Sequence, residues 1–293
     1  LDAMIEQTIH FAPRRNFFAR LILLEGIPGS GKTTLTTRLC ALLREAGTPR
    51  AAWLEGQSDH PVELEHHACL TQEEYAALCA EFPGEAGALA AHAHAEGDFL
   101  LVRYLEDRAP VFSGALLSHL MAREFRYALA PCIPLASYTA VSLSRWRSLA
   151  AEWAGRPGFL LLESAFLQHP VQDLLLHYAL PDEEIIAFLR RAADALTPLS
   201  PVLFYLAPKD VAATLANIAE QRGAPEMAYP DSIAFWAHRQ ALELSALPQL
   251  PFDTHVLCNS SETPEQTALR MRMLLPTSHA VEKPGDCQGA AAP

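Results

Sequence analysis

Lysine is scarce in this sequence. Among 293 residues, only Lys32, Lys209 and Lys283 are lysines, and the formal net charge is −12 at pH 7. Nucleic-acid backbones select surfaces dense in lysine and arginine, so this charge balance argues against a broad nucleic-acid interface. No nucleic-acid partner is therefore expected.

Long hydrophobic runs are also lacking. The most apolar stretches, such as Phe99–Val102 and Phe159–Leu162, are far shorter than the roughly 20 residues of a membrane-spanning helix. The first residues have no apolar core of the kind that a signal peptide carries. The sequence therefore predicts a cytoplasmic protein with no membrane partner.

Paired cysteine spacing is the third absence. The six cysteines include no C-x-x-C pair, and the histidines have no zinc-type spacing to them. Reduced thiols and no zinc site are expected. Half of the residues are hydrophobic, which is enough for one large domain with its own core.

Charge is unevenly distributed along the chain. Residues 51–102 contain ten acids and neither lysine nor arginine, whereas residues 103–156 contain seven arginines. Two solvated faces of opposite sign that pack near each other would explain this pattern. An arginine clamp for an anion is the alternative, and both interpretations stay open at this point.

Short apolar strands alternate with amphipathic helices over most of the chain. Strands are expected at residues 21–25, 51–55, 159–163, 201–206 and 254–258, and helices at residues 32–46, 181–195, 211–221 and 232–246. Strands that are apolar throughout and separated by helices indicate a parallel sheet covered on both faces. The predicted fold class is α/β.

The domain organisation follows from the same pattern. Residues 1–18 are expected to form an N-terminal arm, residues 19–276 one domain, and residues 277–293 a disordered tail. Within the domain, an insert of about residues 60–157 is expected to be mostly helical. The insert separates the second strand from the third.

A glycine-rich loop follows the first expected strand. Gly26–Thr33, GIPGSGKT, fits the pattern G-x-x-x-x-G-K-[ST] between a strand and a helix, which is the context this phosphate-binding motif needs. Its glycines let backbone N–H groups approach phosphate oxygens, next to the positive N-terminal end of the helix. Lys32 is expected to contact the β- and γ-phosphates. The predicted nucleotide-binding set is Gly26, Pro28, Gly29, Ser30, Gly31, Lys32, Thr33 and Thr34, and the predicted cofactors are ATP and Mg²⁺.

Two expected strands end in a carboxylate. Glu163 closes the strand FLLLE, and Glu55 closes the second strand in the same way. Parallel strands deliver their carboxyl ends to one edge of the sheet, so both acids are expected to flank the transferred phosphate. Thr33 and Glu163 are the predicted Mg²⁺ ligands, with an ordinary edge carboxylate as the alternative for Glu163.

The sequence resembles small P-loop kinases of the thymidylate kinase and deoxynucleoside kinase type. The features that it shares with them are the glycine-rich loop after LILLE, the strands that end in Glu55 and Glu163, and the order of the elements. The resemblance spans roughly residues 20–260, and only the phosphate loop is specific. It implies a five-stranded P-loop NTPase sheet and phosphoryl transfer, and it places Arg222 where the group carries a lid arginine. The sequence departs from thymidylate kinases at Glu163-Ser164, where they have Asp-Arg, and in the short segment 223–230, which has no further basic residue.

Substrate choice is expected to reside in the insert, because residues between the second and third strands fold over the carboxyl edge of the sheet. Asp59 and His60 follow the second strand closely enough to contact an acceptor hydroxyl. A simple turn before Pro61 is the alternative for Asp59. Arg145 and Arg147 stand ahead of the third strand, where they are expected to meet acceptor or phosphate charge.

The sequence thus predicts a Mg-ATP-dependent kinase that acts on a hydroxyl of a small molecule, with Lys32, Glu55, Glu163 and Arg222 as catalytic residues. The acids of residues 51–102 favour a neutral or cationic acceptor over a nucleoside monophosphate. The alternative is an NTP-hydrolysing regulatory ATPase or switch that binds a protein partner. No Asn-Lys-x-Asp or Leu-Ser-Gly-Gly segment occurs, which argues against a GTPase and a transport ATPase. A homodimer stays open as the oligomeric state.

Overall fold

The computed structural model describes residues 8–9, 20–57, 59–106, 109–126, 132–258 and 262–275. Its central sheet has six strands in the order β1-β11-β10-β2-β9-β3. Five of them run parallel: β2 (Arg20–Gly26), β3 (Arg50–Trp53), β9 (Phe159–Glu163), β10 (Val202–Ala207) and β11 (Asp253–Cys258). The short strand β1 (Thr8–Ile9) pairs antiparallel with β11. The predicted five-stranded parallel sheet is confirmed.

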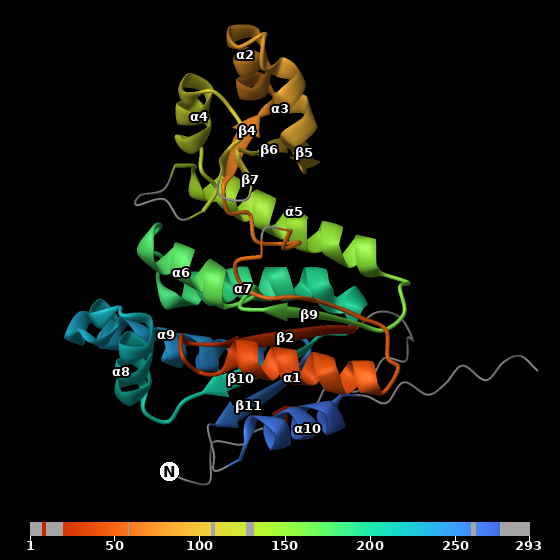
Figure 1. Cartoon of the computed structure of the whole chain (residues 1–293), viewed down its shortest axis with the longest axis vertical. Helices are drawn as coiled ribbons and strands as arrows, with labels where there is room; N and C mark the ends of the chain where they lie inside the picture. The colour runs from red at the N-terminus through yellow and green to blue at the C-terminus, as the bar shows by residue number, and fades with distance from the viewer. Residues whose placement is uncertain are drawn as a thin grey trace, which may run out of the picture.

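Helices cover both faces of this sheet (Figure 1). Side chains alternate along β2, so Leu21 and Leu23 point to one face, while Ile22 and Leu24 point to the other. The first face packs against α5 (Leu135–Trp153), α6 (Gln168–Leu176), α7 (Asp182–Leu196) and α9 (Pro230–Ala246). The second face packs against α1 (Lys32–Glu45) and α10 (Pro264–Leu274). The sheet is therefore buried on both sides, as its apolar strands require.

The strand order places the first long strand, β2, at the centre of the sheet. The chain forms β3 and β9 on one side of β2 and then crosses to form β10 and β11 on the other side. Ligands of open parallel sheets bind at such a switch point, beyond the carboxyl ends of the strands. The Gly26–Thr33 loop follows β2 at this edge.

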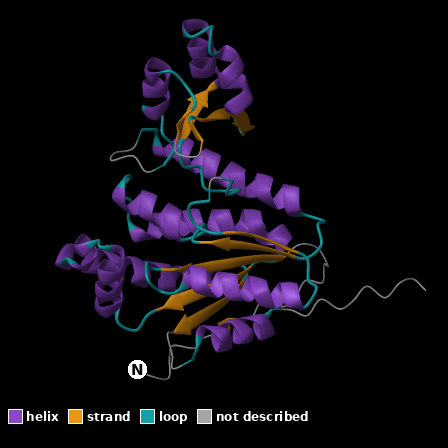
Figure 2. Cartoon of the chain, in the orientation of Figure 1, coloured by secondary structure: helices purple, strands orange, loops and turns teal. Residues whose placement is uncertain are grey.

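The segment between β3 and β9 forms a small unit with its own core. Its three-stranded antiparallel sheet, seen at the top of Figure 2, has the order β4-β6-β5, with β4 (His67–Thr71), β5 (Ala93–Glu96) and β6 (Phe99–Arg103). Around it lie α2 (Gln72–Glu81), α3 (Ala86–His92) and α4 (Gly114–Met121), and the short strands β7 (Leu105–Glu106) and β8 (Ala109–Pro110) pair below. Leu70, Leu89 and Leu116 are fully buried inside this unit. The long helix α5 then leads back to the main sheet.

The expectation of a mostly helical insert was wrong where these strands occur. The alanine-rich stretch is helical up to His92 and then turns into β5, which pairs with β6 in the register Glu96↔Phe99. The two residues between them, Gly97 and Asp98, make the hairpin turn, and Gly97 has a φ of +60°. Cross-strand pairing thus overrides the local helix preference of alanine, and the Gly-Asp dipeptide was the signal for it.

The other structural predictions concern the cysteines, the membrane and the chain ends. Cys40, Cys69 and Cys79 are free thiols. Among the described helices, none is long and apolar enough to cross a membrane. Apart from Thr8–Ile9, the predicted arm lies outside the described residues, and so does the predicted tail.

Candidate active site

The phosphate loop leaves β2 through a position that only glycine can occupy. Gly26 has a φ of +142°, and a Cβ there would lie 2.5 Å from the carbonyl oxygen of Leu206 on β10. At the other end of the loop, Gly31 has a φ of +98° and caps α1, and a Cβ there would meet nothing within 4 Å. The N-terminal end of α1 therefore faces open space, which suits a phosphate group.

Lys32, the first residue of α1, lies under this loop. Its Nζ donates hydrogen bonds to the carbonyl oxygens of Gly26 at 2.8 Å and Ile27 at 3.2 Å. Burial lowers the pKa of Lys32, whereas the charges of Glu55, Glu25 and Glu163 raise it. An anionic phosphate is a stronger hydrogen-bond partner for an ammonium group than a neutral carbonyl is.

Thr33 and Glu163 meet at the mouth of the loop. The Thr33 hydroxyl donates to Glu163 Oε1 at 2.5 Å, and Glu163 is almost fully buried at the end of β9. Its second oxygen, Oε2, is buried and has no hydrogen-bond partner among the described residues. Burial raises the pKa of Glu163, which the Thr33 hydroxyl and Lys32 oppose. An unpartnered carboxylate oxygen beside a hydroxyl fits the oxygen ligands that Mg²⁺ prefers.

The chain turns sharply after Glu163. Ser164 is fully buried and has a φ of +62°, which is uncommon for a residue with a side chain. Glu25, the last residue before the phosphate loop, accepts hydrogen bonds from the backbone N–H groups of Phe166 at 2.7 Å and Gln168 at 3.1 Å. Burial raises the pKa of Glu25 to about 8. β2 thereby holds the connection from Glu163 to α6.

Glu55 lies beyond the end of its strand. β3 ends at Trp53, two residues earlier than predicted, because the Leu54 N–H donates to Gln57 Oε1 at 2.6 Å and Gly56 has a φ of +78°. The side chain of Glu55 is exposed, and its Oε1 accepts a 2.5 Å hydrogen bond from Gln168 Nε2. β3 and β9 are adjacent, so Glu55 and Glu163 reach the same sheet edge, as expected. The negative charges of both residues raise the pKa of Lys32.

A buried polar cluster that the sequence did not predict lies beside Glu55. Arg126 Nε donates to Asp173 Oδ2 at 3.0 Å, and Arg126 Nη2 lies 2.5 Å from His169 Nδ1. His169 Nε2 lies 2.9 Å from Glu63 Oε1, and Tyr138 donates to Asp173 Oδ2 at 2.9 Å. Glu63, Arg126 and Tyr138 come from separate segments, while His169 and Asp173 lie four residues apart on α6. Sequence spacing therefore relates only this one pair. The only local signal was a Gln-His pair shortly after the strand that ends in Glu163.

Arg239 holds the start of α6 from the other side. It is fully buried in α9, where Nε donates to Glu243 Oε1 at 2.8 Å and Nη2 donates to the carbonyl oxygen of Gln168 at 2.5 Å. The Arg239 guanidinium also lies 4.7 Å from the centre of the Trp236 ring. Gln168, which contacts Glu55, is thus fixed through its backbone as well.

Arg222 ends α8 (Val211–Arg222), the helix that packs on the loop. A Cβ at Gly29 would lie 3.1 Å from Thr214 and 3.4 Å from Ile218 of this helix. Positions four apart share one face of a helix, so Arg222 extends that face by one turn, with its side chain exposed. Its predicted role as a lid arginine stays a prediction.

The four predicted acceptor ligands are not gathered at the loop. Asp59, His60 and Arg145 line a cavity of about 170 Å³ at the base of the insert. Arg145 donates to Pro61 O at 2.7 Å, Glu96 Oε2 at 3.1 Å and Glu152 Oε1 at 2.8 Å, so the insert itself engages its guanidinium. Their roles toward a substrate stay predictions.

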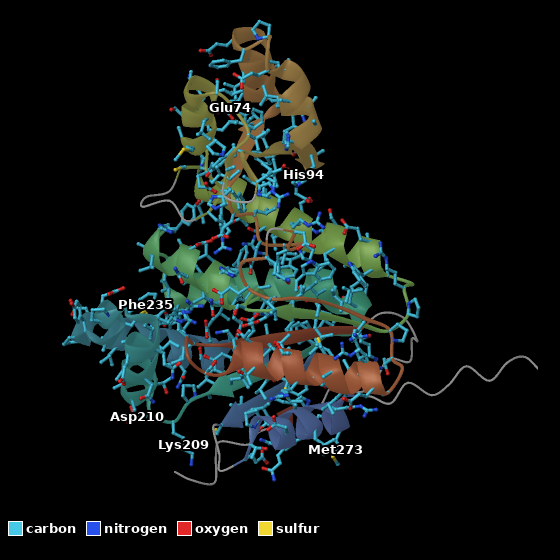
Figure 3. The ribbon with its side chains drawn as sticks, in the orientation of Figure 1. Glu74, His94, Lys209, Asp210, Phe235 and Met273 are labelled. Carbon is cyan, nitrogen blue, oxygen red and sulfur yellow. The ribbon has the colours of Figure 1, made fainter. Side chains whose placement is uncertain are left out.

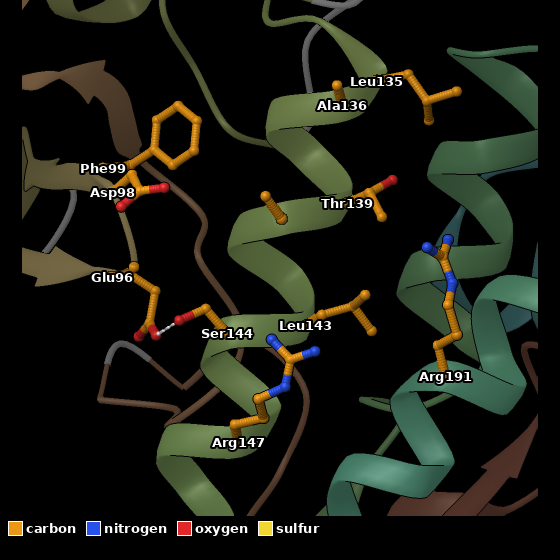
Figure 4. Close-up of a pocket in the computed structure, with 12 residues that line it drawn as sticks. Glu96, Asp98, Phe99, Leu135, Ala136, Thr139, Leu143, Ser144, Arg147 and Arg191 are labelled. Carbon is orange, nitrogen blue, oxygen red and sulfur yellow. Dashed lines mark hydrogen bonds between the residues drawn. The ribbon is translucent and has the colours of Figure 1, made fainter.

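Arg147 lies in a different place. It lines a cavity of about 640 Å³ that also includes Thr139 and Ser144 of α5, Asp98 of the β5–β6 turn and Arg191 of α7 (Figure 4). This cavity contains no residue of the phosphate loop. The predicted role of Arg147 at the acceptor stays a prediction.

No family model and no curated protein matches the chain. A thymidylate kinase from Ehrlichia chaffeensis is a similar solved structure, with 13% identity, a TM-score of 0.42, and coverage of 88% of this chain and 100% of that one. A shikimate kinase from Acinetobacter baumannii bound to shikimate has 13% identity, a TM-score of 0.37 and coverage of 87% and 92%. A thymidylate kinase from Candida albicans has 11% identity, a TM-score of 0.39 and coverage of 87% and 90%. The residues around the loop therefore have to carry the functional conclusion.

Proposed function

We propose that this protein is a Mg-ATP-dependent phosphotransferase that acts on a hydroxyl group of a small molecule. The observation that carries the proposal is the contact between the exposed Thr33 hydroxyl and the buried Glu163 carboxylate, beside Lys32. It combines two oxygen ligands for a divalent cation with one mobile cation for phosphate, at the N-terminal end of a helix.

Each residue has a defined task in this reaction. The Gly26–Thr33 backbone binds the phosphates of ATP, and Lys32 offsets negative charge on the transferred phosphoryl group. Thr33 and Glu163 would hold Mg²⁺, which when bound neutralises charge on the β- and γ-phosphates. The acceptor oxygen forms a bond to the γ-phosphorus, the bond to the bridging oxygen breaks, and ADP leaves with the electron pair. Glu55 takes the proton of the acceptor hydroxyl.

Glu55 suits the base better than Glu163 does. Glu55 is exposed at the sheet edge, and its Oε1 accepts a hydrogen bond from Gln168. Glu163 is buried and already bound to Thr33. A base has to come within hydrogen-bond reach of the hydroxyl that it deprotonates, and only the exposed carboxylate offers that access.

The ion pairs of the insert support a neutral or cationic acceptor. Arg123 pairs with Glu74 at 2.8 Å, and Arg145 pairs with Glu96 at 3.1 Å, so these arginines balance acids of the insert. Glu55 adds negative charge at the sheet edge. A dianionic phosphate brought near unbalanced acids would meet repulsion on the order of a few kcal/mol.

An acceptor screen tests the proposal. The protein is incubated with ATP, Mg²⁺ and equal concentrations of deoxythymidine, its 5′-monophosphate and a panel of amino sugars, and products are identified by mass spectrometry. We expect ADP release that depends on an acceptor, and a phosphorylated neutral or cationic product. ATP hydrolysis that no hydroxyl compound stimulates would instead favour a regulatory ATPase. Preferred phosphorylation of the monophosphate would reverse the assignment of acceptor charge.

A further inference from the structure

We propose that His169 is a positioning residue for Glu55, held in one tautomer by a buried chain of hydrogen bonds that runs from Asp173 to the turn after β3. The kinetic part of this inference rests on the proposed phosphotransferase function. The structural part concerns only contacts within the chain.

The tautomer of His169 follows from its neighbours. A guanidinium group only donates hydrogen bonds, so His169 Nδ1, which lies 2.5 Å from Arg126 Nη2, accepts one and carries no proton. The ring proton of the neutral imidazole is therefore on Nε2, which donates to Glu63 Oε1 at 2.9 Å. Asp173 orients Arg126 in turn, through Arg126 Nε at 3.0 Å.

Burial keeps this imidazole neutral. His169 and Arg126 are each about 5% exposed. Burial lowers the pKa of His169 well below its usual range, and the nearby charges of Arg126 and Arg239 lower it further. Because the neutral ring has one donor and one acceptor, the hydrogen bonds run in one direction: Arg126 donates to His169, and His169 donates to Glu63.

The chain ends on the backbone beside Glu55. Glu63 Oε2 accepts a hydrogen bond from the Gly56 N–H at 2.9 Å. Gln168, the residue before His169, donates to the Glu55 carboxylate itself at 2.5 Å. Two consecutive residues of α6 thus hold Glu55. Gln168 binds its carboxylate directly, and His169 acts through Glu63 on the peptide N–H of Gly56. Because α6 follows Glu163 closely, the two carboxylates are fixed relative to each other.

Substitutions at positions 63 and 169 test the donor and acceptor directions in this chain of hydrogen bonds. In Glu63→Gln, one acceptor oxygen becomes an NH₂ group, which faces either the Gly56 N–H or the His169 N–H as donor against donor. In His169→Gln, the amide oxygen can accept from Arg126 while the NH₂ group donates to Glu63, so both hydrogen bonds keep their direction. In His169→Leu, neither hydrogen bond can form. A residue that only fills space would show no difference between glutamine and leucine at this position.

We expect Glu63→Gln to lower kcat by about ten- to hundredfold through displacement of Glu55, with the ATP affinity unchanged within about twofold. His169→Gln is expected to keep most of the wild-type kcat, whereas His169→Leu should lose about as much as Glu63→Gln. Glu65→Gln and His177→Gln are matched controls that stay near wild type, since Glu65 lies two residues away from Glu63 and His177 caps the C-terminal end of α6. Wild-type kcat in Glu63→Gln, or equal kcat in His169→Gln and His169→Leu, would overturn the positioning role.

Nitrogen NMR of the histidine side chains gives a readout that needs no turnover. The wild-type protein should show His169 as the Nε2–H tautomer without titration between about pH 5 and 8. The Glu55 side-chain carboxyl signal should shift in Glu63→Gln. An Nδ1–H tautomer, a titrating ring or an unmoved Glu55 signal would overturn the inference. A wild-type protein that transfers no phosphoryl group would overturn the proposed function, while these NMR results would still decide the positioning role.

Discussion

The phosphate loop and the insert reach the same sheet edge, but they are built in opposite ways. The loop consists of eight consecutive residues, and Lys32 is held by carbonyl oxygens of the loop itself. The insert has a separate core and reaches the edge through single side chains, Glu63 and Arg126, whose partners come from α6. The first arrangement needs only a strand, glycines and a helix, whereas the second needs several distant residues at once.

This difference predicts different responses to substitution. A side chain that bonds to backbone atoms can be removed while its surroundings keep their structure. A side chain that bonds to other side chains leaves a buried partner unsatisfied, at a cost of about 1–3 kcal/mol. Removal of the Lys32 side chain should therefore affect function without changing the fold, whereas substitutions of the hydrogen-bonded side chains around the insert should couple to each other.

The largest expected effect is the loss of folding stability when a buried leucine is truncated in either of the two hydrophobic cores. Leu116 is fully buried in α4 of the insert, and Leu39 is fully buried in α1 behind the loop. Changing either leucine to alanine should destabilise its own unit by about 2–5 kcal/mol. Hydrogen exchange should show lost protection confined to the insert for Leu116→Ala, with ATP affinity within about twofold of wild type. Equal loss of protection in both units would mean that the insert is not a separate folding unit.

Lys32→Ala should lower phosphoryl transfer about a hundredfold or more and leave the fold intact, because Lys32 offsets charge on the transferred group. Transfer rates and circular dichroism measure the two outcomes. Lys209→Ala is the matched control, since Lys209 lies exposed between β10 and α8 (Figure 3). Undiminished turnover in a folded Lys32→Ala protein would remove the central claim.

Substitutions of Glu163 and Glu55 should affect different steps, nucleotide affinity for Glu163 and the transfer rate for Glu55, each by roughly tenfold or more. Glu163→Gln should weaken nucleotide binding only when Mg²⁺ is present, because Glu163 would hold the ion with Thr33. Glu55→Gln should leave ATP affinity unchanged and reduce transfer. Titrations of ATP with and without Mg²⁺ distinguish the two. Equal effects on ATP affinity would contradict this division while leaving the kinase proposal standing.

The sequence was most informative where structure is local. Glu163 and the Gly26–Thr33 loop could be placed because a buried strand, its last residue and the next helix are contiguous. Glu55 was predicted at the correct edge although its strand ends two residues earlier, since an exposed glutamine side chain sets that turn. Local periodicity therefore located the phosphate half of the candidate site.

The rest depended on contacts between distant residues. β5 is too alanine-rich to be told from a helix without knowledge of its partner β6. The arginine run mixed three situations that composition cannot separate. Arg126 is buried in a hydrogen-bond chain, Arg145 pairs within the insert, and Arg147 lines a cavity away from the loop. Tertiary packing decides which environment each arginine has, and a single sequence carries no information about that packing.

The smallest expected effect, at most about 1.4 kcal/mol for each pH unit, concerns the base of the insert. Glu124 is buried there and accepts hydrogen bonds from the backbone N–H groups of His66 at 3.1 Å and Arg126 at 3.2 Å. Burial raises the pKa of Glu124 to about 8 from a usual value near 4.5. Between these values the folded protein holds a proton that the unfolded chain has released. This contribution to stability is therefore complete below about pH 4.5 and is lost as the pH rises through about 8.

Glu124→Gln keeps an acceptor oxygen for those N–H groups but cannot ionise. The variant should therefore lose less stability than wild type as the pH rises from about 5 to 8, by at most about 1.4 kcal/mol per pH unit. Urea unfolding at several pH values measures the slope, and the exposed residue Glu73 supplies the control Glu73→Gln, which should keep the wild-type slope. Buried histidines such as His67, whose pKa burial lowers to about 4, act in the opposite direction below about pH 6.5, but they act equally in all three proteins. An unchanged slope in Glu124→Gln would mean that Glu124 is ionised in the folded protein, and that the base of the insert is better solvated than its burial indicates.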